Sequence, residues 1–217
     1  MPVWLGVDVG GRRKGFDAAL VGETRLLELR ARLDRDAVLA LVDAARPAVV
    51  AVDSPRSCAP HGERSRACER DLVRAGICQI RWTPDDARVH GGDPYYAWVV
   101  EGLRLYAALA ERDVEVIEVF PTASWTRWHG RRGTRRRSEW TTEALAARGL
   151  SGVPVRTNQD QRDAIAAALT AREHTHRMTE PFGEIVVPRD RARQTRHDFE
   201  PWRPTGSTRR PSRAPRS

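Results

Sequence analysis

The pattern of apolar and polar positions predicts a β-hairpin at the start of the chain. An apolar run over residues 3–9 ends at Gly10 and Gly11, and a second apolar run covers residues 16–21. Glycines between two strand-forming runs favour a tight turn, so the two runs are expected to pair. Over residues 24–32 leucines alternate with polar residues, which predicts a third strand.

Predicted helices and strands then alternate. A helix is expected over residues 37–45, with Asp34 or Asp36 as its N-cap and Pro47 just beyond its end. The uninterrupted apolar run 48–52 is typical of a strand that is buried on both faces. The remaining predicted elements are a helix over 63–75, a short strand or extended piece over 77–82, a helix over 96–111, a strand over 114–120, helices over 142–148 and 158–172, and a strand over 183–187.

The order of these elements indicates one α/β domain over residues 1–187. Residues 56–96 interrupt the alternation with a long polar stretch, which we expect to be an insertion after the fourth strand. From Pro188 onward the chain is rich in Arg, Pro, Ser and Thr, so residues 188–217 are predicted to form a disordered tail. The sequence has neither an apolar run of about 18 residues nor a secretory signal pattern, and we therefore expect a cytoplasmic protein that does not enter a membrane.

The formal net charge of +8 suggests a polyanionic partner, but most of it lies in the predicted tail. From Arg189 to the end, nine Arg stand against three acidic residues, which accounts for +6 and leaves +2 for the rest of the chain. The net charge by itself therefore supports nucleic-acid binding only weakly.

Three cysteines are present, an odd number, and free thiols are the expectation for a cytoplasmic chain. Cys58 and His61 are separated by two residues and would need Cys68 and Cys78 to complete a zinc site. The ten-residue spacings match no compact zinc pattern, so a zinc site stays an open alternative.

Five acidic residues fall where strands end or a helix begins. Asp8, Asp53 and Glu118 come late in three apolar strands, and Asp160 and Asp163 lie three apart near the start of the last predicted helix. A buried carboxylate is costly without a partner, and several carboxylates gathered at one sheet edge are the ligands that hard cations prefer. We predict that these five bind two Mg²⁺ or Mn²⁺ ions and form a catalytic centre for phosphodiester cleavage.

Each acid also has a structural alternative. Asp8 and Asp53 can stabilise turns, and Glu118 can pair with an Arg of the insertion. Asp160 can be an N-cap and Asp163 a first-turn acid that the helix dipole favours.

Basic residues near these acids are candidate phosphate contacts: Lys14, Arg56, Arg64, Arg66 and Arg70. The alternative is that the four arginines form a solvated helix face. A further stretch, residues 125–140, combines Trp and Arg and is either a base-stacking surface or a set of core tryptophans beside a solvated loop.

Six segments in this order resemble a family of bacterial and archaeal domain-of-unknown-function proteins that are assigned an RNase H-like fold and a predicted nuclease activity. The Asp160–Asp163 spacing is similar to the last-helix pair of RuvC-type resolvases. The resemblance implies an RNase H-like mixed β-sheet flanked by helices, and metal-dependent cleavage of nucleic acid. The segments are GVDVGGRRKGFDAAL (6–20), VAVDSPRSC (50–58), ERSRACERDL (63–72), GICQIRWTP (76–84), EVFPTASW (118–125) and DQRDAIAAAL (160–169).

Two other functions compete with a nuclease. An actin-like phosphotransferase or ATPase would use the first hairpin as a phosphate loop, but it needs two lobes and a second Asp-x-Gly strand, and here that strand continues as Asp53-Ser54-Pro55. A non-catalytic nucleic-acid-binding protein with the same fold is the other alternative, and the complete set of acids argues against it.

Overall fold

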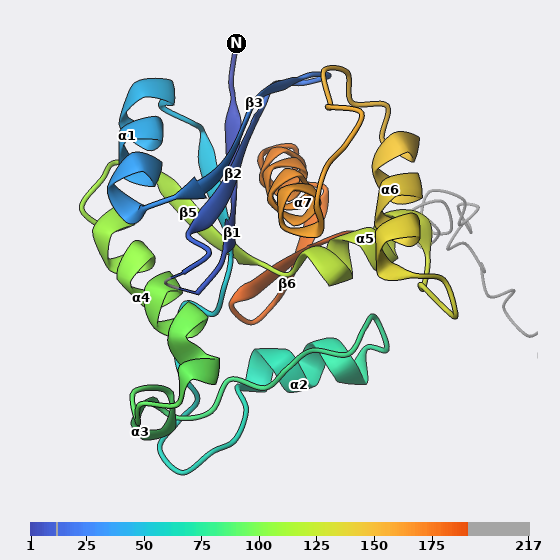
Figure 1. Ribbon diagram of the computed structural model, residues 1–217. Helices are drawn as coiled ribbons and strands as arrows, with labels where there is room; N and C mark the ends of the chain where they lie inside the picture. Colours follow the sequence, from blue (N-terminus) through green and yellow to red (C-terminus); the bar gives the residue numbers. More distant parts are fainter. Residues whose placement is uncertain (12, 191–217) are drawn as a thin grey trace, which may run out of the picture.

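Seven strands form one mixed sheet in the computed structural model, which describes residues 1–11 and 13–190 (Figure 1). The order across the sheet is β3-β2-β1-β4-β5-β7-β6. β1, β4, β5 and β7 run parallel, whereas β2, β3 and β6 are antiparallel to their neighbours. Neighbouring parallel strands end at the same edge, so β1, β4 and β5 have their carboxyl ends together. The strands are β1 Trp4–Val9, β2 Phe16–Val21, β3 Leu26–Leu33, β4 Val49–Asp53, β5 Glu115–Val119, β6 Thr179–Phe182 and β7 Ile185–Pro188.

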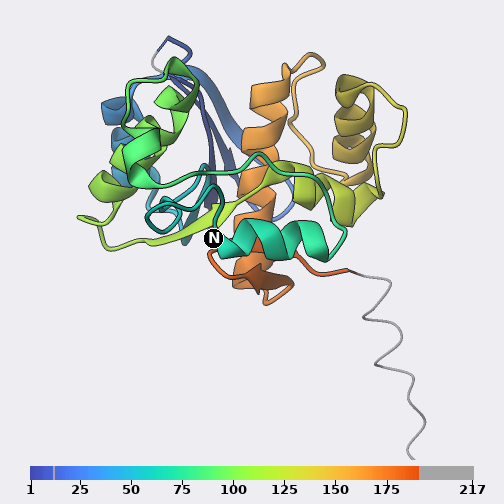
Figure 2. The same ribbon diagram turned by 90° about the horizontal axis from the view of Figure 1, so that it is seen from below.

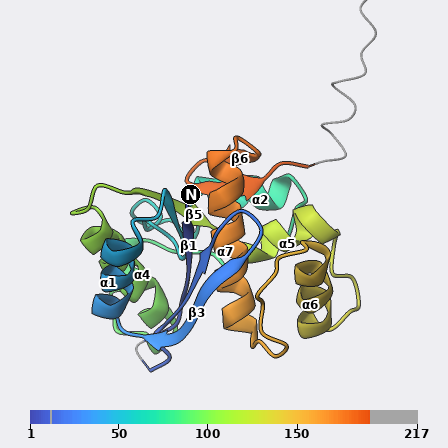
Figure 3. The same cartoon turned by 90° about the horizontal axis from the view of Figure 1, so that it is seen from above.

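Helices cover both faces of the sheet. Figure 3 shows α1 and α4 on one side and α7, α5 and α6 on the other. Each side has its own apolar core, and this sheet between two helical layers is the α/β class that the sequence predicted. The helices are α1 Arg35–Ala45, α2 Ala67–Arg74, α3 Asp86–Val89, the 3₁₀ turn η1 Pro94–Tyr96, α4 Ala97–Leu109, α5 Pro121–His129, α6 Arg137–Ala147 and α7 Gln159–Thr175.

Small residues let α7 lie unusually close to the middle of the sheet. The turns of α7 that face the sheet carry Ala164, Ala167 and Ala168, all fully buried. A Cβ atom on Gly6 of β1 would stand 2.1 Å from the carbonyl oxygen of Ala164 and 2.2 Å from the amide nitrogen of Ala168. Only glycine fits at position 6, and it brings the helix against β1 next to the end of that strand.

The segment between β4 and α4 holds α2, α3 and η1. Figure 2 shows α2 beside β6 and the end of α7. The extended piece predicted over residues 77–82 pairs with no strand; instead, the Glu69 carboxylate of α2 accepts the Thr83 backbone N–H at 3.0 Å. The buried Glu69 side chain therefore satisfies the backbone amide just beyond this segment.

Besides the later start of α2, the earlier start of α6 and the unpredicted short elements α3 and η1, three features differ from the sequence predictions. α5 was not predicted, because its Pro121 looks like a strand stop but occupies the first helical turn, where proline is tolerated. β6 was not predicted, and it pairs with β7 despite its own proline at position 181. Pro188 closes β7 and the Arg189 amide donates to the carbonyl of Met178, so the predicted tail starts too early; its remainder, 191–217, lies outside the described residues.

No helix in the described part of the chain is long and apolar enough to span a membrane.

Candidate active site

Three neighbouring strands each contribute one carboxylate to the same face of the sheet. Asp8 of β1 is the register partner of Asp53 on β4 and of Asp17 on β2. Paired residues on neighbouring strands point to the same face. Gly6 lies two residues before Asp8 on β1, so the two residues face the same side of the sheet, and Gly6 contacts α7. The carboxylates of Asp8, Asp53 and Asp17 therefore all lie on the α7 face. Asp17 was not among the predicted site residues, and only the hairpin register places it beside Asp8.

α7 brings Asp163 to this edge as a nearly fully buried carboxylate. Its oxygens accept hydrogen bonds from Trp125 Nε1 at 2.9 Å, from Gln159 Nε2 at 3.0 Å and from an Arg137 guanidinium nitrogen at 2.8 Å. The donors come from three helices, α5, α7 and α6. Asp163 is thus held by many more bonds than a first-turn acid that merely favours the helix dipole.

Asp160 lies one turn earlier on α7 and is more exposed. The N-cap of α7 is Asn158, whose side chain accepts the Gln161 amide at 2.7 Å, so the alternative role of Asp160 as N-cap is wrong. The Asp160 carboxylate instead binds Lys14 Nζ at 2.9 Å, from the turn between β1 and β2. This ion pair ties the start of α7 to the glycine-containing hairpin turn.

Burial and mutual repulsion make the ionised site unfavourable. The pKa of Asp8 is well above its usual range, because the carboxyl group is desolvated and lies near the negative charges of Asp53, Asp163, Asp160 and Asp17. A cation placed among these groups would relieve this repulsion.

The other two buried acids show the same effect, partly offset by one arginine. Burial and the charge of Asp163 raise the pKa of Asp53, and the charge of Arg137 opposes the increase. Burial also raises the pKa of Asp163, again against the effect of Arg137 and the Trp125 hydrogen bond. Arg137 is therefore the group that does most to balance the charge of Asp53 and Asp163.

Glu118 does not join this cluster. On β5 its register partner is Val52, not Asp53, so its side chain points to the opposite face of the sheet from Asp53. Both of its carboxylate oxygens are bound by the Arg66 guanidinium, at 2.8 and 2.5 Å, and one also accepts the Arg56 amide at 2.9 Å. Glu118 therefore pairs with an arginine of the insertion, which was the alternative role considered for it. We leave Glu118 out of the proposed ligand set.

Arg66 is likewise not a surface residue. Its side chain is buried and also binds Glu69 at 3.1 Å and Glu184 at 3.1 Å. Four buried or half-buried charges thereby join α2 to β5 and to the turn before β7. Arg66 therefore does not fit its predicted role as a phosphate contact, because its guanidinium group already binds three carboxylates.

Of the other predicted phosphate contacts, Lys14 is the one bonded to an acid of the cluster. Arg56 lies over the ring of Tyr106 at 5.5 Å, Arg70 binds Glu63 at 3.0 Å, and Arg64 is exposed. The four arginines therefore do not act as one solvated helix face.

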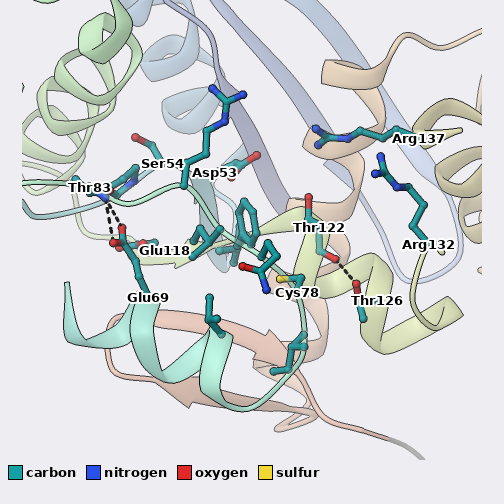
Figure 4. Close-up of a pocket in the computed structure, with 18 of the residues that line it drawn as sticks. Asp53, Ser54, Glu69, Cys78, Thr83, Glu118, Thr122, Thr126, Arg132 and Arg137 are labelled. Carbon is teal, nitrogen blue, oxygen red and sulfur yellow. Dashed lines mark hydrogen bonds between the residues drawn. The ribbon is translucent and has the colours of Figure 1, made fainter. Parts of the chain in front are cut away.

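Two cavities meet at the acidic edge. One, which we call the Asp53 cavity, measures about 740 Å³ and includes Asp53, Arg132 and Arg137 in its wall (Figure 4). The other, the Asp8 cavity, measures about 420 Å³ and includes Asp8 and Asp160 together with the basic residues of the hairpin turn and β3. The carboxylates thus lie between two partly basic recesses. Sequence reasoning missed Arg132 and Arg137 as site residues, although it had singled out the stretch that contains them.

The acids are a fitting donor set for a divalent cation but are not arranged around one. Within residues 1–11 and 13–190, no three His, Cys, Asp or Glu side chains already converge as ligands. The reason is visible in the hydrogen bonds, because Asp163 is turned to its three donors and Asp160 to Lys14. Oxygen-only donors of this kind suit Mg²⁺ or Mn²⁺.

The cysteines give no support to a zinc site. All three are free thiols, and Cys58 packs in a different apolar cluster from Cys68 and Cys78. Burial raises the pKa of all three thiols, to about 12 for Cys78, which disfavours the thiolate that zinc requires.

The mixed sheet flanked by helices, with acids at the ends of β1 and β4 and on α7, has the α/β architecture that the sequence predicted. The chain belongs to a family described as "Protein of unknown function (DUF429)", whose model matches residues 6–184. The resemblance given above is therefore confirmed at the level of the family.

Two similar solved structures are both of RuvC from Thermus thermophilus. The one described as "Thermus thermophilus RuvC structure" is 18% identical, with a TM-score of 0.47, and the match covers 82% of this chain and 99% of that one. The one described as RuvC in complex with a Holliday junction substrate is 17% identical, with a TM-score of 0.49, and the match covers 83% and 99%. Neither similarity extends to function at these values. A comparison with curated proteins gave no match.

Proposed function

We propose that this protein is a metal-dependent phosphodiester hydrolase that acts on nucleic acid. The observation that carries the proposal is the register pairing of Asp8 with Asp53, with Asp163 buried close enough to raise the pKa of both. Such a concentration of negative charge beside arginines is costly for a purely structural site and useful for a cation-dependent one.

Asp8, Asp53, Asp163 and Asp160 are the residues that would hold the metal, either Mg²⁺ or Mn²⁺, and two ions are the natural count for four carboxylates. Bound ions would supply Lewis-acid stabilisation of charge on the phosphodiester oxygens. Asp8 has Asp53 and Asp17 on its two sides, so it is the residue best placed to be shared between two ions.

The basic residues would change partners when a cation binds. Arg137 and Lys14 now neutralise Asp163 and Asp160. A cation would take over that neutralisation and leave the guanidinium and the ammonium to contact substrate phosphates. Arg132, exposed on the wall of the Asp53 cavity, would add a further phosphate contact.

The test is cleavage of a panel of end-labelled single-stranded, duplex, branched and hybrid nucleic acids in Mg²⁺, in Mn²⁺ and in EDTA. We expect cleavage that needs the metal and that is lost in Asp8→Asn and Asp53→Asn. Asp36→Asn is the matched control, because Asp36 is an exposed acid in the first turn of α1, away from the site. Equal activity of Asp8→Asn and Asp36→Asn would contradict the proposal.

An actin-like phosphotransferase is the weaker alternative on structural grounds, because it needs two lobes, whereas residues 1–11 and 13–190 contain one seven-stranded sheet. A non-catalytic nucleic-acid-binding role would explain the basic recesses but not the buried acids between them. In the cleavage panel, metal-independent binding without any product would favour that role.

A further inference from the structure

The Asp53 cavity extends well beyond the carboxylates. Its volume of about 740 Å³ falls within the range of small-molecule sites, roughly 300–1,000 Å³, and exceeds what a phosphate and its metal ions need. One wall is the extended segment of residues 76–83, and the opposite wall is formed by α5 and the loop that leads into α6. The Arg131 guanidinium donates to the Gly76 carbonyl and so joins the two walls.

The interior of this cavity offers flat apolar contacts. Ile80, Trp98 and Phe120 line it, and each is only partly buried by the rest of the protein. Gln79 lies beside them with an exposed side-chain amide, a group that both donates and accepts hydrogen bonds. Such a wall suits a planar, heteroatom-rich ring.

Two exposed aromatic side chains lie on or close to the extended segment of residues 76–83. Trp82 is 43% exposed and Tyr95 is 41% exposed, both large for aromatic side chains. Arg81 lies over the Tyr95 ring at 5.5 Å and donates to its hydroxyl at 2.9 Å. Neither ring lines the Asp53 cavity itself, whereas Arg81, which contacts Tyr95, and Thr83, which follows Trp82, do line it. Exposed aromatic rings next to arginines form the surfaces on which unpaired bases stack.

Another part of the cavity wall carries positive charge. Arg132 and Arg137 lie next to each other on this wall in Figure 4, and Arg137 binds the Asp163 carboxylate at 2.8 Å. Phosphate contacts would therefore fall next to the carboxylates, and ring contacts would fall farther along the cavity. A nucleotide carries the same two kinds of group, a phosphate and a base, at its opposite ends.

We infer that the Asp53 cavity binds an unpaired nucleotide, with its phosphate at Arg132 and Arg137 and its base against Trp98 and Ile80. Binding of the nucleotide does not depend on the proposed function, whereas cleavage of the bound nucleic acid does. A base inside a duplex is stacked and paired and cannot enter a cavity without leaving the helix. The preferred substrate is therefore single-stranded nucleic acid, or a duplex with an unpaired base beside the reacting phosphate.

The test is a comparison of affinities for three labelled DNAs of one sequence, measured by fluorescence anisotropy with the full chain in EDTA, where no metal-dependent cleavage occurs. The DNAs are a 15-nucleotide single strand, its perfect duplex, and the duplex with one extra unpaired 2-aminopurine. We expect the single strand to bind on the order of tenfold more tightly than the duplex, because stacking on aromatic side chains is available only to unpaired bases. The unpaired 2-aminopurine should change its emission on binding, whereas the same base in the perfect duplex should not.

Two exposed positions allow variants that leave the core intact. Gln79→Ala should reduce the preference for the single strand, because the Gln79 amide lies in the cavity beside the residues assigned to the base, and Arg132→Ala should weaken binding to all three DNAs. Arg30→Ala is the control, because Arg30 is an exposed arginine on β3 outside both cavities. Trp98→Ala should abolish the 2-aminopurine change; a melting curve shows whether it folds, and Gln79→Ala decides the question if it does not.

The outcomes separate this inference from the nuclease proposal. Equal affinity for single strand and duplex overturns the inference, even if both are cleaved in Mg²⁺. A single-strand preference without any metal-dependent cleavage supports the inference and contradicts the nuclease proposal. If free deoxyadenosine monophosphate competes as well as the 15-nucleotide strand, the cavity serves a small nucleotide, and the assignment to a polymeric substrate is overturned.

Discussion

Arg137 donates to Asp163 at 2.8 Å, so a half-exposed guanidinium already occupies the cationic partner position of the most buried acid in the site. The same arginine lowers the pKa of Asp53, the neighbouring strand acid. It therefore serves two carboxylates that the nuclease proposal assigns to the metal. In the nuclease proposal, a bound metal ion would take the place of Arg137 as the partner of this negative charge.

Arg137→Gln is expected to destabilise the metal-free protein. The loss should be about 1–2 kcal/mol, less than for a fully buried charged hydrogen bond, because half of the Arg137 side chain is exposed. Since the acids then lack their internal cation, Mg²⁺ should raise the melting temperature more in the variant than in the wild type. Arg136→Gln, at the neighbouring exposed position, should change neither quantity. An unchanged Mg²⁺ effect in Arg137→Gln would contradict competition between the two cations.

Asp8→Asn is expected to change activity and stability in opposite directions. The amide keeps the shape of the side chain but removes the charge, so cleavage should fall on the order of a thousandfold or more if Asp8 is shared between two metal ions. In EDTA the variant should be as stable as the wild type or more stable, because one of the repelling charges is gone. A turn-capping Asp8 would give modest destabilisation and little change in activity. Melting curves and cleavage rates, measured side by side, separate the two roles.

The stability difference between Asp8→Asn and the wild type should depend on pH. The pKa values of Asp8, Asp53 and Asp163 are all raised in the folded protein. A raised carboxyl pKa means that the folded state binds the proton more tightly, so its stabilisation is full below the usual pKa of about 4 and is lost as pH rises through the folded value. In EDTA the advantage of Asp8→Asn should therefore be small at pH 4 and increase toward pH 7. An advantage that instead decreases over this range would show that the acids are stabilised as ions.

Arg66→Met is expected to be strongly destabilising. Removing one partner of a buried ion pair typically costs about 3–5 kcal/mol, and here Glu118 and Glu69 would both lose their cation. The double variant Arg66→Met, Glu118→Gln should recover part of the loss, because it removes one uncompensated charge. Urea unfolding measures both values. If Arg66→Met keeps its stability but binds nucleic acid more weakly, Arg66 is a phosphate contact, as the sequence predicted.

The sequence was sufficient to pair Asp8 with Asp53 because both end apolar strands, and parallel neighbours end at one edge. Glu118 satisfied the same criterion and still lies on the other face. The alternation within β5 correctly placed Glu118 on the same face as Val116. Whether Glu118 shares a face with Asp53 depends on the register between β4 and β5, and packing sets that register. The one-residue offset between Asp53 and Glu118 could not be predicted from the pattern.

Tertiary contacts also decided the roles of several basic and aromatic residues. Trp125 and Trp140 are core residues, as one of the two alternatives held. Arg66 looks like its neighbours Arg64 and Arg70 in sequence, and only the fold places it between three carboxylates. The local pattern contains only one of its partners, Glu69, while Glu118 and Glu184 lie 52 and 118 positions away, so it does not distinguish this buried arginine from a solvated one.

Gly6→Ala tests whether the close approach of α7 to β1 positions the acids. The new Cβ would stand 2.1 Å from the Ala164 carbonyl oxygen, far inside any tolerated contact, and the obstacle is backbone that cannot rotate away. The helix would have to move outward, and overpacking of this kind should cost about 3 kcal/mol or more. The same movement would carry Asp163 away from Asp8 and Asp53. Gly11→Ala is the matched control, because a Cβ there meets nothing within 4 Å. We expect Gly6→Ala to lower the urea midpoint sharply and to abolish the Mg²⁺-induced rise in melting temperature, while Gly11→Ala retains both. A Gly6→Ala protein with wild-type stability and an intact response to Mg²⁺ would show that the distance between α7 and β1 does not control the site.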